Sequence, residues 1–297
     1  MYSQITQNKR KTVFLIIIFS MVILLISWVL GMQFDSPTLG ILIGTMVATI
    51  MILIGYFKGD SVALAASGAK PIERRDRPEL YDLVENLCIT AGMPMPKVYI
   101  MHDPSANAFA TGRDPEHASI AVTTGLLSIM TKAELEGVIA HELSHVKNYD
   151  IRVMTLVVVL VGVIVLLSDL ILRSTFFRTG RRNQDSGQVA LILVVVGLVL
   201  AILSPIIAEL IKLSVSRSRE YLADASGSLL TRYPDGLADA LQKIAEHDRP
   251  MARANHATAH LFLANPFDPH VQKKFESLFS THPPIEDRIA KLRGMTR

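Results

Sequence analysis

Four long apolar stretches separate the hydrophobic from the polar parts of the chain. They cover residues 12–32, 38–57, 151–172 and 188–211. A helix needs about 20 apolar residues to cross a hydrocarbon layer roughly 30 Å thick, and each stretch is long enough. The pattern predicts four transmembrane helices, arranged as an N-terminal hairpin in residues 1–57 and a second hairpin in residues 151–211.

The polar remainder consists of two segments, residues 58–150 and 212–297, on either side of the second hairpin. Each segment mixes acidic and basic residues without a long run of either charge. We expect the two segments to fold together into one domain that the second hairpin interrupts. A cleaved signal peptide is an alternative interpretation of the first apolar stretch, but that stretch is long for a signal and no small-residue cleavage site precedes the second.

Basic residues predict the orientation, because lysine and arginine favour the cytoplasmic side of a membrane. Three lie at residues 9–11, none lies at residues 33–37, and Lys58 follows the second stretch. We therefore expect the N-terminus and the polar domain in the cytoplasm. Four arginines within residues 173–182 break the rule. Either they face outward, or the stretches 151–172 and 188–211 do not cross the membrane fully.

The polar segments show the pattern of a small α+β domain that is mainly α-helical. Pro78 opens a helix that ends before Gly92, and Thr131 with Glu134 forms the capping box of another helix. Short runs separated by turn residues predict a small antiparallel sheet. These runs cover residues 97–101, 108–111 and 119–123, and further helices are expected at residues 237–245 and 284–292.

Composition narrows the class of protein. Half of the 297 residues are hydrophobic and 19% are charged, which is typical of a membrane protein with a sizeable polar part. The net charge of +3 is spread along the chain and does not indicate a nucleic-acid partner. The single cysteine, Cys88, excludes an intrachain disulfide, and its place on the apolar face of the helix 78–91 indicates a buried hydrophobic residue.

The helix that Thr131 opens carries the sequence His141-Glu142-Leu143-Ser144-His145. Histidines four residues apart lie on one face of a helix, so both imidazoles can bind the same Zn²⁺ ion. Glu142 is offset from that face, and its carboxylate can act as a general base on a water molecule. This is the H-E-x-x-H pattern of metalloproteases, although so short a pattern also arises by chance.

A catalytic zinc ion needs a third protein ligand and one open position. The best candidate is Glu220, which Asp224 follows on the same helical face. The spacing fits a metal-binding carboxylate and a second carboxylate that orients a ligand histidine. The alternative is a solvated acidic face paired with nearby arginines. Both segments lie next to apolar stretches, so we expect the site close to the membrane surface.

Three runs, residues 141–150, 220–224 and 280–288, together resemble the HtpX-type membrane metalloproteases, gluzincin-class relatives of the CAAX prenyl endoprotease. The resemblance covers nearly the whole chain, including four apolar segments in the same order. It implies a multi-pass zinc endopeptidase of bacterial protein quality control in the inner membrane, with one Zn²⁺ per chain and a cytoplasmic active site. Its expected partners are the lipid bilayer and misfolded or damaged membrane proteins.

The resemblance also implies roles for single residues. By the family pattern, His141, His145 and Glu220 bind zinc and Glu142 is the general base. Later elements of the pattern match His282, Pro283 and Arg288, which would line the site, and His282 or Arg288 would stabilise the oxyanion. The family's edge strand, to which a substrate adds as an extra strand, is matched by Asn107, Ala108, Phe109 and Ala110.

Two other functions stay open at this level. One is a dedicated processing protease with a single substrate, and the other is a non-catalytic zinc-binding membrane scaffold. A second histidine pair, His256 and His260, also has a spacing of four, but no glutamate follows the first histidine. We interpret this pair as surface or core histidines, because most such pairs bind nothing.

Overall fold

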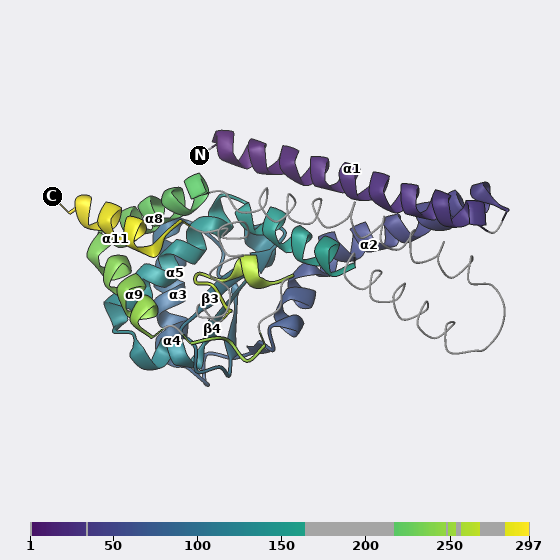
Figure 1. Cartoon of the computed structure of the whole chain (residues 1–297). Coiled ribbons are helices and arrows are strands. Elements are labelled where there is room, and N and C mark those ends of the chain that lie inside the picture. Colours follow the sequence, from purple (N-terminus) through teal and green to yellow (C-terminus); the bar gives the residue numbers. More distant parts are fainter. Residues whose placement is uncertain are drawn as a thin grey trace.

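The computed structural model describes residues 2–33, 35–163, 217–247, 249–253, 257–267 and 283–296. Figure 1 shows a globular domain from which a long helical arm extends. The arm is made by the N-terminal apolar residues, and the domain combines residues from both polar segments of the sequence.

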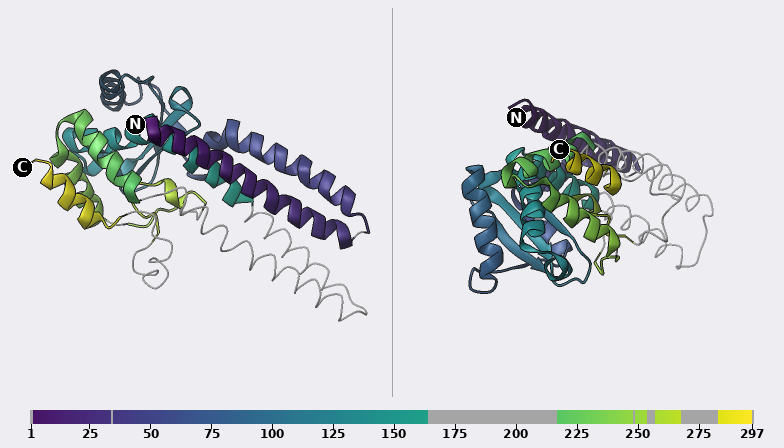
Figure 2. Two further views of the ribbon diagram at one scale, coloured as in Figure 1. Left: turned by 90° about the horizontal axis from the view of Figure 1, so that it is seen from above. Right: turned by 90° about the vertical axis from the view of Figure 1, so that its left-hand side faces the viewer.

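Two helices form the arm, α1 (Tyr2–Gln33) and α2 (Pro37–Ala66), which lie side by side (Figure 2). Residues Ile5–Trp28 and the whole of α2 are long and apolar enough to cross a membrane. Their outer faces expose large apolar side chains such as Met21 and Leu42, which are 62% and 63% exposed. Lipid, not water, is the solvent that favours such a surface. The first predicted hairpin corresponds to this pair of helices.

The second predicted hairpin lies only partly within the described residues. Residues 150–163 are helical, and Leu156 and Leu160 join Leu15 and Phe19 of α1 in one buried apolar cluster. The remainder of the stretch 151–172 and the whole stretch 188–211 lie outside the described residues. The structure therefore supports two membrane helices and a third apolar helix that packs against them.

The domain contains a four-stranded sheet in the order β1-β2-β4-β3. Its strands are β1 (Lys70–Pro71), β2 (Lys97–Met101), β3 (Ala108–Gly112) and β4 (Ala118–Thr123). Strands β2 and β4 are parallel, whereas β1 and β3 are antiparallel to their neighbours, so the prediction of an antiparallel sheet is wrong and the sheet is mixed. Every side chain of β4 is buried, which suits a central strand. Because β4 lies between β2 and β3, β3 is an edge strand of the sheet.

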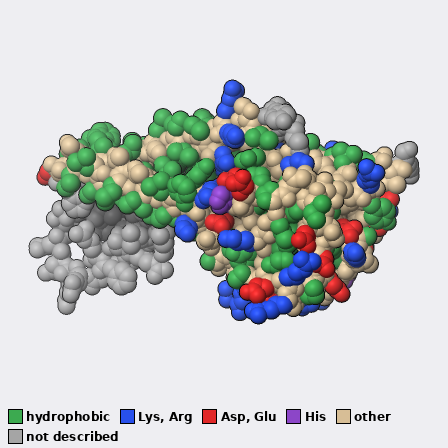
Figure 3. Space-filling view, turned by 180° about the vertical axis from the view of Figure 1, so that it is seen from behind, with side chains coloured by type: hydrophobic (Ala, Val, Ile, Leu, Met, Phe, Trp, Pro, Cys, Tyr) green, Lys and Arg blue, Asp and Glu red, His purple; other side chains and the backbone are tan. Residues whose placement is uncertain are grey.

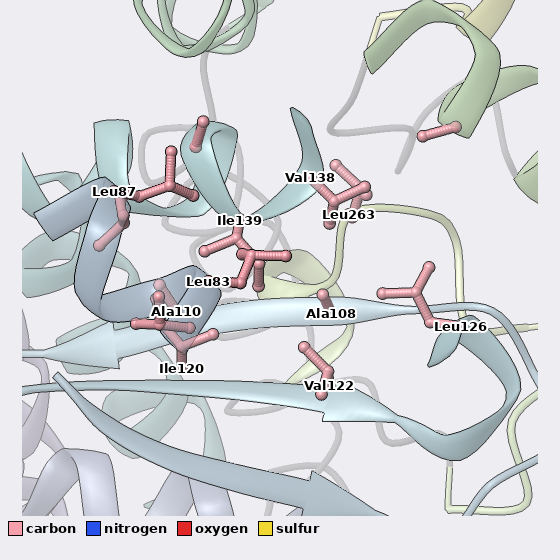
Figure 4. Packing of buried hydrophobic residues seen from close by; sticks show 14 of the residues in the cluster. Leu83, Leu87, Ala108, Ala110, Ile120, Val122, Leu126, Val138, Ile139 and Leu263 are labelled. Carbon is pink, nitrogen blue, oxygen red and sulfur yellow. The ribbon is translucent and has the colours of Figure 1, made fainter. Parts of the chain in front are cut away.

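Helices α3 (Pro78–Ala91) and α5 (Lys132–Lys147) cover one face of this sheet. Figure 4 shows their apolar side chains against those of β3 and β4, with Leu83 and Ile139 among them. The predicted helix 78–91 is confirmed, and Gly92 follows its last residue with φ of 64°. Cys88 is buried as predicted, and burial raises the pKa of its thiol to about 11.

The remaining helices surround α5. Helices α8 (Arg217–Thr231) and α9 (Pro234–Glu246) pack directly on it, and α11 (Ile285–Gly294) packs on α9. A short helix, α4 (Thr124–Ile129), connects β4 to α5. Because α5 lies between the sheet and these helices, its residues from Gly137 to Val146 are all buried.

Candidate functional site

Helix α5 carries the H-E-x-x-H motif, and the predicted capping box fixes its start. Thr131 Oγ1 accepts the Glu134 N–H at 3.4 Å, and a Glu134 carboxylate oxygen accepts the Thr131 N–H at 2.7 Å. Lys243 of α9 donates to the same carboxylate at 2.8 Å. These bonds satisfy backbone donors at the helix start and tie α5 to α9.

Three side chains from α5 and α8 converge on one point. His141 Nε2 and His145 Nε2 lie 3.2 Å apart. One carboxylate oxygen of Glu220 lies 3.8 Å from His141 Nε2, and the other lies 3.5 Å from His145 Nε2. Two atoms bound to a tetrahedral ion at about 2.0–2.1 Å are themselves about 3.3 Å apart. The three side chains therefore fit the ligand set of one small metal ion.

A second carboxylate lies behind each of the two histidines. Asp224 Oδ1 is 2.9 Å from His141 Nδ1, and Asp150 Oδ2 is 3.1 Å from His145 Nδ1. An ionised carboxylate only accepts hydrogen bonds, so each Nδ1 carries the proton and each Nε2 keeps its lone pair for a metal ion. The two aspartates thus fix the tautomer and the orientation that metal binding requires.

The buried charges of this cluster favour a divalent cation. They are the carboxylates of Glu142, Asp150, Glu220 and Asp224 and the guanidinium groups of Arg219 and Arg288. Four negative and two positive groups leave a formal charge of −2 when the histidines are neutral. Buried charges are expensive unless they are paired or bind a metal. A divalent ion held by two imidazoles and a carboxylate would restore the balance.

The two histidines differ in their affinity for protons. Burial lowers the pKa of His141 and dominates there. Burial also acts to lower the pKa of His145, but the hydrogen bond from His145 to Asp150 and the charge of Glu220 outweigh it and raise that pKa to about 9. A proton on His145 Nε2 therefore competes with a metal ion for the same lone pair.

Glu142 lies next to the three converging side chains and is 3% exposed. Burial raises the pKa of its carboxyl to about 7, against the opposing charge of His145 and with a further contribution from the charge of Glu220. The backbone N–H of Ala110 on β3 faces this carboxyl and acts to lower its pKa. A group that titrates near neutral pH is well suited to accept and return a proton.

Arg288 of α11 holds Asp224 in place. Its Nε and Nη2 donate to the two carboxylate oxygens of Asp224 at 2.9 and 2.6 Å, and Nη1 lies 3.7 Å from Glu220 Oε2. This is the two-pronged geometry of strong arginine–carboxylate pairs. Arg288 therefore supports the site from behind, and only Nη1 faces Glu220. His282 lies outside the described residues, and Pro283 is buried just before α11.

The close approach of α8 to α5 depends on Gly227. A Cβ atom at this position would lie 2.9 Å from the backbone nitrogen of His141 and 3.1 Å from the carbonyl carbon of Ala140. Side chains do not reach such short distances, so glycine is required for this contact. Glu220 lies about two turns earlier on α8, and the contact therefore sets its distance from the histidines.

The outer edge of β3 passes beside Glu142. In an antiparallel pair, alternate residues direct their backbone groups away from the partner strand, and in β3 these residues include Ala108 and Ala110. The Ala108 carbonyl accepts the Leu263 N–H at 3.0 Å, and the Ala110 N–H faces the Glu142 carboxyl. The chain itself therefore occupies part of the edge that the sequence predicted to bind substrate.

Asn107 and Gly112, at the two ends of this edge, are also engaged. The Asn107 amide donates to the Ala264 carbonyl at 2.9 Å and accepts the Ala264 N–H at 3.1 Å. The Gly112 N–H donates to Thr155 Oγ1 at 3.0 Å. Of the predicted substrate strand, Ala110 is the residue whose backbone N–H faces the carboxyl of Glu142.

Sequence reasoning did not identify Asp150 and Arg219 as site residues. Asp150 follows α5, and a turn through Tyr149, at φ of 60°, brings its carboxylate back towards His145. Arg219 Nη1 lies 3.2 Å from Asp150 Oδ1. The sequence shows an acidic residue five positions after the motif, but it does not show the turn that makes the contact.

The second histidine pair is only partly described. His260 is buried, and its Nε2 lies 3.0 Å from the Met154 carbonyl, which agrees with a core histidine. His256 lies outside the described residues. The group that could hold a metal ion, within the part of the chain that the structure describes, is His141, His145 and Glu220.

Comparison with known proteins identifies a family along most of the chain. The model of Peptidase family M48 matches residues 74–296. That range includes the motif helix α5, the helix α8 with Glu220, and Arg288 on α11.

Several relatives are similar over their whole length, and each is described as a protease HtpX homolog. The one from Dictyoglomus turgidum is 46% identical over 294 residues, covering 99% of this chain and 94% of the relative. The one from Caldanaerobacter subterraneus is 44% identical over 298 residues, covering 100% and 98%. The one from Tropheryma whipplei is 47% identical over 299 residues, covering 99% and 98%.

A solved structure shares the fold. The crystal structure of S. mikatae Ste24p aligns with a TM-score of 0.50 at 18% sequence identity, covering 98% of this chain and 67% of that one. At this identity the likeness shows the fold alone.

Proposed function

The chain belongs to peptidase family M48, and from this premise we propose that it is a zinc endopeptidase that cleaves misfolded or damaged membrane proteins at the cytoplasmic face of the bacterial inner membrane. Family membership makes the chain a metalloprotease, and the apolar arm makes it a membrane protein. The observation that carries the proposal is the convergence of His141, His145 and Glu220 beside the buried carboxyl of Glu142.

The donor set supports zinc as the metal. Two imidazole nitrogens and one carboxylate are a known ligand set of catalytic zinc sites and leave one tetrahedral position open. A zinc ion held there would activate a water molecule and polarise the carbonyl group of the scissile bond. His141 and His145 are prepared for this role because Asp224 and Asp150 keep the proton on each Nδ1.

Glu142 would move the proton. In its ionised form it accepts a proton from the attacking water, and in its protonated form it returns that proton to the leaving amine. The pKa of about 7 allows both directions near neutral pH. The Ala110 N–H faces this carboxyl from the edge of β3.

We propose that an extended substrate pairs with the Ala110 carbonyl, which points to the same side of β3 as the Ala110 N–H. Asn107 and Ala108 already bind residues 263–264, so the pairing surface is shorter than the whole predicted strand. Two N–H groups of Arg288 are directed to Asp224. For this reason we assign Arg288 a supporting role and keep His282 as the candidate for oxyanion stabilisation.

Charge and position support the location. Basic residues at positions 9–11 of α1 and Lys58 of α2 favour a cytoplasmic domain. The α1 residue Asn8 donates to Asp150 beside the metal site, so the site lies near the root of the membrane arm. Polypeptide segments leaving the bilayer would meet the site there, which favours membrane proteins as substrates.

The test compares purified wild type with Glu142→Gln for zinc content and for cleavage of an unfolded membrane protein. We expect the variant to keep zinc and to lose cleavage by at least about 100-fold, because general acid–base catalysis contributes about 10²–10⁴-fold. Glu220→Gln should lose both zinc and cleavage. Glu136→Gln, on the same helix and partly exposed, is the matched control. Full cleavage by Glu142→Gln would refute the mechanism.

The same assay separates the alternatives. Cleavage of several unrelated unfolded membrane proteins supports quality control, whereas cleavage of a single partner indicates a dedicated processing protease. Zinc binding without cleavage of any membrane protein would indicate a scaffold.

A further inference from the structure

We propose that Asn8, on the membrane helix α1, is a positioning residue for the metal site, and this rests on the proposed zinc function. Its side chain is buried, with 1% exposed. Buried amides need hydrogen-bond partners, and those of Asn8 lie in the catalytic domain and not in the arm. The arm and the site are therefore one structural unit.

Both ends of the Asn8 amide are engaged. Its Nδ2 donates to Asp150 Oδ1 at 2.7 Å and to the Asn148 carbonyl at 2.8 Å. Its Oδ1 accepts a hydrogen bond from Arg219 Nη1 at 3.2 Å. Asn148 and Asp150 lie in the turn after α5, and Arg219 lies on α8. Helices α5 and α8 carry the three converging side chains.

Asp150 connects Asn8 to His145. One carboxylate oxygen of Asp150 accepts the hydrogen bond from Asn8 Nδ2, and the other lies 3.1 Å from His145 Nδ1. Tyr149, directly before Asp150, has φ of 60°, a conformation that residues other than glycine adopt at a cost. Asn8 binds the chain on both sides of Tyr149 and thereby holds this turn in place.

Loss of Asn8 should therefore act on the metal site. Without Asn8, Asp150 loses one hydrogen bond that holds its carboxylate towards His145, and the Asn148 carbonyl loses the other. Partners that orient a metal ligand change metal affinity or activity about 10–100-fold when they are mutated. Asn8 acts one residue further away, so we expect the lower end, about tenfold.

The experiment uses the full chain with Asn8→Ala and Asn8→Asp. Asn8→Asp keeps the size of the side chain but replaces its N–H donors with an oxygen beside Asp150. Ser20→Ala is the matched control, because the Ser20 hydroxyl donates to the Ile16 carbonyl of the same helix. The readouts are the rate of zinc release to a chelator and the visible spectrum of the Co²⁺-substituted protein, which reports ligand geometry without turnover.

We expect both Asn8 variants to release zinc about ten times faster and to change the Co²⁺ spectrum, while Ser20→Ala does neither. Unchanged release and an unchanged spectrum in both Asn8 variants would overturn the proposal, even if cleavage falls. Wild type that binds zinc but cleaves nothing would refute the proposed function and would still allow the Asn8 comparison.

A second, independent observation concerns the neck, defined as the junction of α2, the start of the helix at residues 150–163 and the loop after β3. We infer that the neck binds the headgroup of an anionic phospholipid. It contains a cavity of about 230 Å³. Figure 3 shows Lys and Arg side chains, with acidic side chains and a histidine among them, where the hydrophobic arm meets the domain.

Cations outnumber anions in the lining of this cavity. The charged lining residues are Lys58, Lys97, Arg113 and Arg152, against Asp60 and Glu116. Four positive and two negative groups leave a formal charge of +2, of which the Asp114 carboxylate, 3.5 Å from Arg113 Nε, offsets one. The neck therefore attracts an anion such as a phosphodiester.

Aromatic residues place the neck at the level of lipid headgroups. The Arg113 guanidinium lies 5.3 Å from the Phe57 ring, and that of Arg152 lies 5.8 and 5.0 Å from the rings of Tyr56 and Tyr149. Aromatic and basic residues at the end of an apolar stretch, as at the end of residues 38–57, mark the membrane interface. Basic pockets beside membrane helices are typical sites for anionic headgroups. A lipid lying along the exposed face of α2 would thus bring its phosphate to the cavity.

The test measures binding of phosphatidylglycerol, phosphatidylcholine and inorganic phosphate to the full-length protein by native mass spectrometry. The variant is Lys58→Gln with Arg113→Gln. Arg75→Gln with Arg293→Gln removes the same charge from exposed side chains that do not line the cavity. Each basic residue near an anionic lipid surface strengthens binding of the lipid. We therefore expect the loss of two such residues to weaken phosphatidylglycerol binding about thirtyfold.

We expect tighter binding of phosphatidylglycerol than of phosphatidylcholine, lost in the neck variant and kept in the control. Equal losses in the two variants would show diffuse attraction and overturn the site. Inorganic phosphate binding as tightly as the lipid would show a site for soluble anions and overturn the lipid assignment.

Discussion

Gly227 of α8 lies against the backbone of His141 of α5 so closely that a methyl group at residue 227 would come within 2.9 Å of the His141 nitrogen. Glu220 belongs to the first of these helices, and both motif histidines belong to the second. The separation of the three converging side chains therefore depends on a helix contact that includes none of them.

Gly227→Ala should move α8 away from α5 and weaken zinc binding, because the added Cβ meets backbone atoms that cannot rotate away. Overpacking of this kind costs about 1–3 kcal/mol of stability. The measurements are the thermal midpoint and the zinc affinity in detergent. Gly294→Ala is the control, since an added Cβ there has nothing within 4 Å among the described residues. Wild-type zinc affinity in Gly227→Ala would contradict this account of the contact.

Asp224→Asn should weaken zinc binding by about 10–100-fold, because the amide no longer fixes the His141 tautomer and no longer balances Arg288. Competition with a chelator of known affinity measures this loss. Asp239→Asn provides the comparison, since that carboxylate pairs with Arg293 at the exposed surface. If both variants bind zinc equally well, Asp224 does not orient His141.

Arg288→Met should destabilise the fold by about 3–5 kcal/mol, because it leaves the carboxylate of Asp224 buried without its partner. The double variant Arg288→Met with Asp224→Asn should recover part of this loss. Thermal midpoints of the single and double variants in the absence of zinc measure the coupling. Strictly additive midpoint shifts would show that the pair is not energetically linked.

The stability of the zinc-free protein should fall as the pH rises from about 6.5 to about 9. The folded state raises the pKa of His145 from 6.5 to about 9, so it binds this proton more tightly than the unfolded chain does. The resulting stabilisation, about 3 kcal/mol, is complete below pH 6.5 and is lost as the pH approaches 9. The thermal midpoint measured across this range reports the loss.

Two variants identify the group responsible. His145→Gln should flatten the decrease between pH 6.5 and 9. Glu142→Gln should leave the decrease in place, because the pKa of Glu142 rises from 4.5 to about 7 and its contribution is lost over that lower range. A decrease that persists in His145→Gln would assign the effect to another group.

Features that depend on near neighbours in sequence could be predicted well. The capping box of Thr131 and Glu134, the helix that ends at Gly92 and the common face of His141 and His145 all follow from local spacing. Local hydrogen bonds and the helical repeat determine them, and both can be read from a single sequence.

Features that depend on contacts between distant segments could not be predicted from the sequence. The parallel pairing of β2 with β4 depends on how a hairpin docks, and the sequence predicted an antiparallel sheet instead. The hydrogen bond from Asn8 to Asp150 joins residues 142 positions apart, and a polar residue near the start of a membrane helix has no pattern that names its partner. Such contacts are set by tertiary packing alone.

The covered edge of β3 has a consequence for the behaviour of the protein among unfolded chains. An open strand edge is a template on which extended polypeptides polymerise, and on the proposed function the protein would meet such polypeptides as substrates. Three contacts satisfy backbone groups along or beside that edge. They are made by the Leu263 N–H, by the Asn107 amide with Ala264, and by Thr155 Oγ1. If substrates pair beside Glu142 as proposed, these contacts shorten the open edge that could otherwise seed aggregation.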